Sequence, residues 1–428
     1  MEVFIIELAI ISLISLLLVI VIGFIKKLNM GILALGASLI IATIFKLDEK
    51  LIIEAFSANI FITMAGVSFY FAILTDNETL STSASKLVYL FGKHKYIVPL
   101  VIFVIGAFLS SLGPGPLPLL AVIPVLAVPI AMSTGHNPVM LSIIGQCGAM
   151  GARMSPLTPD YAVVHGLLKD FQPASDIKFY LSGIFTAFVI SLVVFIYYKG
   201  WRLDYKSDHE LEKTSFNKEH IISLITLLIL IVAFIIVAFI IFYTNVGLTA
   251  FAMGSLLGLL NIGDEKEAIK KIPWGVILLV LGVGILMNIV ISSGGIKFMA
   301  DKLSTSINKQ NAGPIVVFFA NSISFFASGL GVVFPTLVPM VLEMTSSFND
   351  PNFTSELISM VIIGGTFTGL SPFTTAGALV MSAVSTDDRI SKKFSQNKLF
   401  MELLFLALFI ILIEMILSYI GIYSFIFR

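Results

Sequence analysis

Charged side chains and cysteines are scarce in this chain of 428 residues. Only 12% of its residues are Asp, Glu, Lys or Arg, against roughly 25% in an ordinary soluble domain. This shortage excludes a soluble enzyme, because a globular fold needs many polar side chains to cover its surface. A single cysteine, Cys147, excludes an intramolecular disulfide framework and a zinc site built from several cysteines.

Net charge and catalytic motifs are lacking as well. The 26 Lys and Arg residues balance 26 Asp and Glu residues, so no basic excess favours nucleic acid as a partner. The sequence contains no His-Glu-x-x-His motif and no Gly-x-x-x-x-Gly-Lys motif, which argues against an intramembrane metalloenzyme and against ATP-driven transport. We therefore expect no enzyme activity and no bound cofactor.

Apolar residues dominate instead, at 57% of the chain. A helix of about 20 apolar residues crosses the hydrocarbon core of a bilayer, and ten stretches of this kind predict an all-α polytopic membrane protein with the lipid bilayer around it. The expected spans are residues 3–25, 28–46, 57–75, 138–168, 177–199, 219–243, 245–260, 272–292, 355–385 and 397–426.

Two further apolar regions, 97–132 and 312–345, are interrupted near their middle by Gly, Pro and Ser. These residues cannot continue a helix across the membrane, so we expect two re-entrant hairpins. Non-helical backbone at membrane depth survives only where protein buries it or where it lines a watery cavity. Both hairpin tips should therefore face a binding site.

The sequence repeats itself at an offset of 216 residues. Asp48-Glu49-Lys50 returns as Asp264-Glu265-Lys266, and Ser155-Pro156 with Thr158 returns as Ser371-Pro372 with Thr374. We expect a first repeat at 1–200, a cytoplasmic linker at 201–217 and a second repeat at 218–428. Each repeat holds five spans and one hairpin; because five is odd, the second copy is inverted, as in many secondary transporters. Chance similarity between apolar helices is the alternative.

The distribution of basic residues predicts the orientation. With this topology, 17 of the 26 lysines and arginines fall on one face, which is then cytoplasmic. Both chain termini lie outside, and the expected location is the inner, or plasma, membrane.

The expected site lies where the backbone is irregular. The spans 138–168 and 355–385 each contain a Gly-rich, Ser-Pro break, and broken helices expose N–H groups and carbonyls that suit an anion and a cation. Close helix packing is the alternative role of these small residues. The expected substrate-binding residues are Ser110, Ser111, Gly113, Arg153, Ser155, Ser328, Gly329, Thr366, Thr368 and Ser371.

Ionised or coordinating groups in these spans suggest how transport is coupled. Oxygen ligands at Ser111, Gly151, Ser328 and Thr368 could hold Na⁺. Asp160 and Glu414 could carry protons instead, although Glu414 could equally be bonded to a neighbouring helix. Arg153 is the only basic residue away from the loops; it either neutralises a substrate carboxylate or pairs with Asp160.

The segment Asn29–Leu35, the segment Phe61–Ile73 and Asp76–Thr79 resemble the malonate or dicarboxylate carrier family MatC, within the ion transporter superfamily that includes divalent-anion sodium symporters. The resemblance is best over residues 28–168. It implies a homodimer whose mobile domain carries substrate by an elevator-type motion. The symporters' Ser-Asn-Thr signatures are missing from the tips here, which weakens the inference to sodium.

Taken with the repeat, these features predict a secondary active transporter of a small organic anion, best a dicarboxylate, coupled to Na⁺ or H⁺. A cation/proton antiporter of the same superfamily and a passive channel remain the alternatives.

Overall fold

The computed structural model describes residues 2–26, 28–79, 82, 86, 95–168, 171, 173, 175–203, 215–240, 246–296, 298, 308–325, 328–386 and 396–428. Every regular element in these ranges is a helix. The linker 201–217 lies mostly outside them.

Each of the ten expected spans coincides with a helix or a broken helix. In the first half these are α1 (Glu2–Lys26), α2 (Met30–Phe45), α4 (Ala58–Asp76), α8 (Pro138–Gly151) with α9 (Pro159–Leu167), and α10 (Asp176–Tyr197). In the second half they are α11 (Lys218–Ile240), α12 (Val246–Leu259), α14 (Trp274–Ser292), α18 (Pro351–Phe367) with α19 (Thr375–Thr386), and α21 (Gln396–Tyr419). Five described helices are long and apolar enough to cross a membrane unaided, or six spans if one bent pair is counted.

Both expected hairpins are pairs of helices. The first consists of α6 (Val98–Ser111) and α7 (Pro116–Thr134). The second consists of α16 (Ala312–Ser324), a π-helical turn η2 (Gly329–Val333) and α17 (Phe334–Thr345), and its two arms bend by 119°. Short 3₁₀ turns are η1 (Lys95–Ile97), η3 (Ser346–Phe348) and η4 (Thr368–Leu370).

Three short helices add to the expected elements. Helices α3 (Glu49–Glu54) and α13 (Glu265–Lys271) follow α2 and α12, and each is capped by an aspartate, Asp48 or Asp264, that accepts from the backbone N–H two residues on. The last expected span, 397–426, is divided: Gly421 has a φ of 77°, so the chain turns after α21 and forms α22 (Ile422–Phe427).

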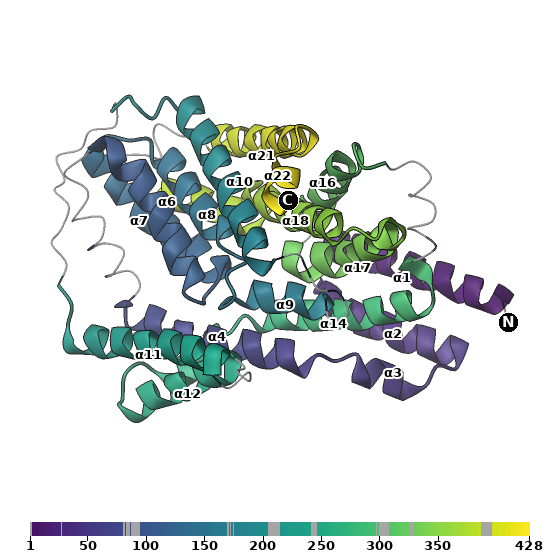
Figure 1. Cartoon of the computed structure of the whole chain (residues 1–428). Coiled ribbons are helices and arrows are strands. Elements are labelled where there is room, and N and C mark those ends of the chain that lie inside the picture. Colours follow the sequence, from purple (N-terminus) through teal and green to yellow (C-terminus); the bar gives the residue numbers. More distant parts are fainter. Residues whose placement is uncertain are drawn as a thin grey trace.

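The helices form two layers (Figure 1). The support layer contains α1 to α4, α11, α12 and α14, and the cavity layer contains the hairpins, the broken helices, α10, α21 and α22. Hairpin and broken helix pack together in each half, α6 and α7 on α8, and α16 and α17 on α18. The irregular backbone of both halves is thereby gathered in one layer.

Two glycine crossings hold the support layer together. A Cβ atom at Gly31 of α2 would collide with the carbonyl of Leu278 in α14, and one at Gly282 with the carbonyl of Gly31. Gly66 of α4 and Gly247 of α12 are equally close to the opposing backbone. The 216-residue offset converts Gly31 into Gly247 and Gly66 into Gly282, so the two crossings are equivalent. Such reciprocal contacts are typical of a two-fold relation.

The positions of α3 and α13 agree with that relation. Helix α3 directly precedes the N-terminus of α4 at Ala58, whereas Lys271 at the end of α13 forms an ion pair with Asp76 at the C-terminus of α4. A helix of 19 residues is about 28 Å long. The corresponding helices α3 and α13 therefore lie at opposite ends of a span.

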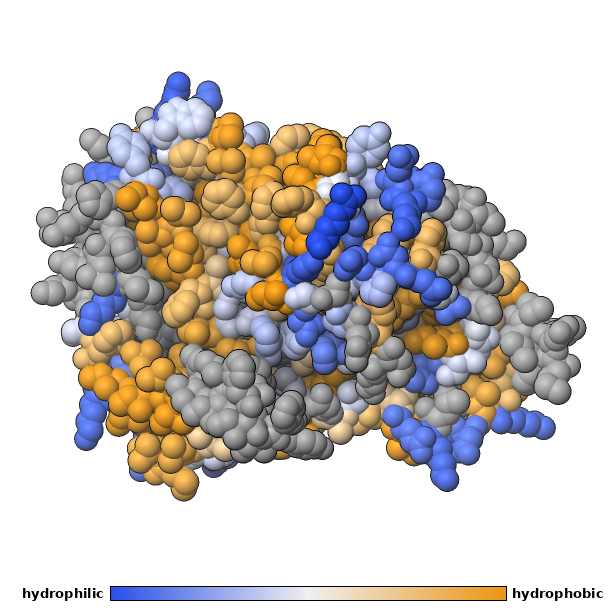
Figure 2. Space-filling view, in the orientation of Figure 1, coloured by the Kyte–Doolittle hydropathy of each residue, from blue (hydrophilic) through white to orange (hydrophobic). Residues whose placement is uncertain are grey.

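Apolar side chains cover much of the surface (Figure 2). Leu39 and Ile44 of α2 and Phe405 of α21 are each about 60% exposed. Monomeric soluble proteins rarely expose such continuous apolar area. Together with the apolar helices, this surface identifies a multi-pass helical membrane protein.

Candidate functional site

A cavity of about 260 Å³ lies in the cavity layer, where the two halves of the chain meet. Its walls come from α7, the break after α8, the tip of the second hairpin, the break after α18 and the start of α19. The lining residues are Pro116, Leu117, Leu120, Met150, Arg153, Ser324, Ser328, Gly329, Gly365, Thr366, Gly369, Phe373, Thr374, Thr375 and Ala376. Four residues expected from the sequence, Arg153, Ser328, Gly329 and Thr366, are among them. We call this space the central cavity.

The first break has a defined geometry. Helix α8 ends at Gly151, and the hydroxyl of Thr158 lies 2.5 Å from the carbonyl oxygen of Arg153 and 2.8 Å from that of Ser155. The same hydroxyl oxygen accepts from the N–H of Tyr161 and so caps α9. Thr158 thus fixes the turn that exposes the groups of the break.

The second break repeats these bonds at the offset of 216 residues. The hydroxyl of Thr374 bonds the carbonyls of Gly369 and Ser371. In both breaks the Ser N–H donates to the carbonyl three residues earlier, Ser155 to Ala152 and Ser371 to Thr368. The repeated Ser-Pro-x-Thr pattern in the sequence therefore encodes one local structure used twice.

Arg153 is buried and connects the two halves. Its Nε and Nη2 atoms donate to Oδ1 of Asp160 at 2.8 and 2.5 Å, and its Nη1 donates to Oγ1 of Thr366 at 2.8 Å. The guanidinium carbon also lies 5.0 Å from the ring centre of Phe334, within the range of a cation–π contact. The ion pair considered from the sequence is present, and it is extended by a bond to the second break.

This pairing leaves Arg153 with capacity for a ligand. A guanidinium carries five N–H donors. Among the described residues, four of them are used: two on Asp160, one on Thr366 and one in a long 3.4 Å contact to the Gly365 carbonyl. One N–H of Nη2 remains. The residue also lines the central cavity. Arg153 can therefore hold the two halves together and present a donor to an anion.

The second hairpin tip closes directly on the second break. Ser328 Oγ accepts from the N–H of Gly331 at 3.2 Å and caps the π-helical turn. Gly329 lies against the carbonyl of Gly365, where a Cβ atom would collide. Thr366 donates its hydroxyl proton to Ile362 O at 2.5 Å, so its oxygen is free to accept from Arg153.

The residues expected at the first tip lie together but outside the cavity lining. Ser155 Oγ donates to Ser111 O at 2.7 Å, and Ser111 Oγ donates to Ala107 O and approaches the Tyr180 hydroxyl at 3.0 Å. Ser110 Oγ is buried with no hydrogen-bond partner among the described residues. Gly113 adopts a φ of 139°, so its lack of a side chain permits the tip.

Three other expected residues lie in the surrounding structure. Gly151 packs against Gly183 of α10. Thr368 Oγ1 donates to Gly364 O at 3.1 Å, and Ser371 Oγ accepts from Phe373 N at 3.3 Å. Their hydroxyl oxygens retain lone pairs. Among the described residues, no group of three His, Cys, Asp or Glu side chains could hold a metal ion.

Gln146 is a residue that the sequence analysis missed. Its Nε2 donates to Leu120 O in α7 at 2.8 Å and to Ala376 O in α19 at 3.3 Å, and it is fully buried. It thereby ties α8 to two helices that line the cavity. Its signal in the sequence was a lone amide in the apolar first part of the span 138–168.

Comparison with known proteins gives one family match. A profile of the family described as "Dicarboxylate carrier protein MatC N-terminus" matches residues 5–153, which end at Arg153. No curated protein matches the chain at a significant level.

Two solved structures are similar in fold. The YdaH transporter of Alcanivorax borkumensis has a TM-score of 0.61 at 14% identity, over 87% of each chain. MtrF of Neisseria gonorrhoeae, from a class of antimetabolite efflux pumps, has a TM-score of 0.59 at 15% identity, over 86% of this chain and 81% of MtrF. At these identities the likeness concerns the fold alone. The family description and the reports of both structures name transport proteins.

Proposed function

We propose that the protein is a secondary active transporter that takes up a small organic anion, of which a dicarboxylate is the best candidate, through the central cavity. The observation that carries this proposal is the buried Arg153 at a cavity lined by the second hairpin tip and both helix breaks. A transporter needs its binding site between elements whose movement opens the site first to one side of the membrane and then to the other. The broken helices and the hairpin tip meet at this cavity.

The cavity offers positive potential from three directions. Besides the free donor of Arg153, the N-termini of α7 and α19 contribute Pro116, Leu117, Thr375 and Ala376 to its walls. A helix N-terminus carries a partial positive charge and unpaired N–H groups, which suit a carboxylate. In the first turn of α7 the donor at the cavity wall is the N–H of Leu117, because Pro116 has none. Two such ends and one guanidinium edge match an anion with two carboxylates.

Size supports a small substrate. The cavity holds about 260 Å³, below the roughly 300–1,000 Å³ of pockets that accept drug-sized ligands. The family match, whose description names a dicarboxylate carrier, points to the same substrate class.

The expected architecture completes the proposal. The equivalent crossings of α2 with α14 and of α4 with α12 support two inverted repeats. We further propose an elevator-type motion of the cavity layer against the support layer, a homodimer, and an inner-membrane location with both termini outside. Arg153, Ser328, Gly329 and Thr366 are the proposed substrate contacts.

Coupling to Na⁺ or H⁺ provides the driving force. The buried hydroxyl of Ser110 and the oxygens of Ser111, Ser328 and Thr368 support a sodium ion near the tips and breaks. Cation/proton antiport is the weaker alternative, because Asp160 is held by Arg153 in an ion pair.

The test is a thermal-shift screen of purified protein against mono-, di- and tricarboxylates, followed by counterflow in liposomes. A ligand that binds the folded state raises its apparent stability. We expect a dicarboxylate to give the largest shift and to show saturable counterflow, which a passive channel lacks. Equal or no shifts across the series would reject the proposal. Undiminished uptake with choline in place of sodium would reject sodium coupling.

A further inference from the structure

Glu414 is a fully buried carboxyl group that the central cavity does not explain. It lies in α21, and its Oε2 accepts from Asn321 Nδ2 of α16 at 2.7 Å. Asn321 uses its amide again on Val317 O at 2.9 Å. The bond to a neighbouring helix, considered from the sequence, therefore exists, but it satisfies only part of the pair.

The Glu414–Asn321 pair contains two acceptor oxygens that receive no hydrogen bond from the described residues. Glu414 Oε1 and Asn321 Oδ1 are both buried without a hydrogen-bond partner among the described residues. Unpaired buried acceptors are costly, and an unpaired buried carboxylate is far more so. A proton on Glu414 removes the charge and converts one acceptor into a donor. The unpaired acceptors therefore favour a proton on Glu414 in this conformation.

The groups facing Glu414 offer no compensating cation. From α16 it meets Asn321, and from α22 it interacts electrostatically with the buried Tyr423, whose hydroxyl lies 2.9 Å from Thr186 Oγ1 of α10. On α18, the acidic residue Glu356 lines the adjoining pocket. Among the described residues, Glu414 forms no ion pair with a Lys, Arg or His, and its one hydrogen bond is to Asn321.

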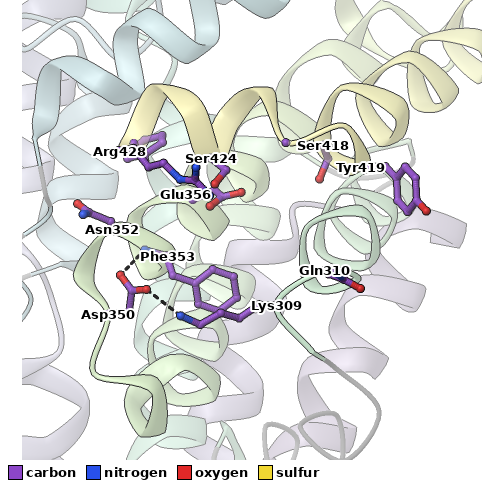
Figure 3. A pocket seen from close by; sticks show the side chains of 12 residues that line it. Lys309, Gln310, Asp350, Asn352, Phe353, Glu356, Ser418, Tyr419, Ser424 and Arg428 are labelled. Atoms are coloured by element: carbon purple, nitrogen blue, oxygen red, sulfur yellow. Dashed lines mark hydrogen bonds and ion pairs between the residues drawn. The ribbon is translucent and has the colours of Figure 1, made fainter.

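A water-accessible pocket opens one helical turn away. This pocket, of about 610 Å³, lies between the loops before α16 and α18, the start of α18, the end of α21 and α22 (Figure 3). We call it the α18–α22 pocket. Ser418, four residues beyond Glu414 on the same helix, lines it, and one turn of helix is about 5.4 Å. Glu356, Ser424 and Arg428 lie together at its polar wall (Figure 3).

The central cavity lies about one turn away in the other direction. Ser324, three residues beyond Asn321 on α16, lines that cavity, and three residues of helix rise about 4.5 Å. Glu414 and Asn321 therefore lie between the α18–α22 pocket and the central cavity. The helix of Glu414 reaches the α18–α22 pocket, and the helix of Asn321 reaches the central cavity.

From this placement we propose that Glu414 carries the coupling proton of the carrier. The proton is taken up on Oε1 from water in the α18–α22 pocket and leaves as the carboxylate becomes exposed to the opposite side. Asn321 is a positioning residue that holds the carboxyl group through Oε2. This inference rests on the proposed function and assigns its coupling ion and the group that binds it.

The test compares Glu414→Gln with Glu402→Gln, a control near the start of the same helix, in liposomes with labelled malonate. Glutamine keeps the shape and the bond to Asn321 but cannot release a proton. We expect Glu414→Gln to retain counterflow within about 3-fold and to lose acid-driven accumulation at least about 10-fold in sodium-free buffer. Glu402→Gln should keep both. Accumulation by Glu414→Gln at the wild-type level would overturn the proposal.

A second measurement needs no transported substrate. Infrared difference spectra of purified protein between acidic and alkaline buffer should contain carbonyl bands of protonated buried carboxyl groups, and one of these bands should be missing in Glu414→Gln and present in Glu402→Gln. If malonate shows no counterflow in the wild type, the proposed substrate fails while this band still tests Glu414. Identical bands in Glu414→Gln and wild type would overturn the assignment, as would loss of malonate counterflow in a well-folded Glu414→Gln.

Discussion

Arg153 shows how a costly residue is accommodated at the residue scale. Insertion of arginine at the middle of a span costs about 2.5–3.5 kcal/mol, and the equivalent position in the second half is Gly369. Asp160, Thr366 and Phe334 reduce this cost in the folded protein. The sequence offered Asp160 as one of two partners for Arg153, because the two residues are seven positions apart in one expected span. It could not predict Thr366, which lies 213 positions away.

Hydroxyl groups were harder to interpret than the charged residue. Serine and threonine can bond their own helix, and Thr368 does so with Gly364. Composition and spacing cannot distinguish such a bond from a ligand contact. The three-dimensional contacts therefore distinguish residues that looked equivalent in the sequence. Ser328 lines the cavity, whereas Ser371 is not part of the lining and accepts from the N–H of Phe373.

His136, in the loop between α7 and α8, predicts a pH dependence of stability. Burial, with a smaller effect of Lys95, lowers its pKa from 6.5 to about 4. Its Nδ1 lies 2.9 Å from Thr134 Oγ1, and its Nε2 has no partner among the described residues. In the unfolded chain the imidazole binds a proton at about pH 6.5. Stability is therefore full above that pH and declines on acidification towards pH 4.

We expect the apparent Tm of purified protein to fall between pH 6.5 and 4, and His136→Gln to flatten part of this fall. His165→Gln, at an exposed imidazole, serves as the control and should leave the profile unchanged. An unaltered profile in His136→Gln would show that other groups cause the dependence.

At the scale of elements, apolar length predicted where the long helices lie but not the short ones. All ten stretches became helices or broken helices because backbone groups in lipid must bond within their own segment. Helices α3 and α13 were missed because helices of six and seven residues that contain several charged side chains give no span signal. Gly421 divides the last span because its φ is positive. The sequence did not predict this, since a glycine near the end of a long apolar run gives no sign of its φ.

The glycine crossings give a matched prediction for the support layer. Gly31→Ala should lower the unfolding free energy by about 1–3 kcal/mol, the usual range for overpacking, because its Cβ would collide with Leu278 O. Gly36→Ala, on the same helix with open space around it, should be neutral or slightly stabilising. The measurement is the thermal midpoint in detergent. Equal midpoints for the two variants would contradict close packing of α2 on α14.

For the whole molecule, inversion of the second repeat is the principal expectation. The sequence predicted it from an odd number of spans, and the structure adds the equivalent crossings and the placement of α3 and α13 at opposite ends of α4. The sequence could not predict which helices of the two halves are in contact. A repeat shows which helices are equivalent, but not which helices pack together.

Lys50 and Lys266 are equivalent exposed positions on α3 and α13, so they test the inversion directly. In a Cys147→Ser background, Lys50→Cys should react with a membrane-impermeant maleimide in intact cells. Lys266→Cys should react only after the membrane is opened. Labelling of both from the same side would mean that the repeats are parallel.

The central claim is that Arg153 binds the anion as well as bridging Asp160. The decisive measurement is the affinity of purified Arg153→Ala/Asp160→Ala protein for the dicarboxylate that most stabilises the wild type. Removing both charges avoids leaving a buried Asp160 unpaired, so the fold should persist. Loss of one charge-assisted bond costs about 1.5–3 kcal/mol, which predicts roughly 10- to 100-fold weaker binding. Wild-type affinity in this folded double variant would contradict the claim and leave Arg153 as a structural bridge alone.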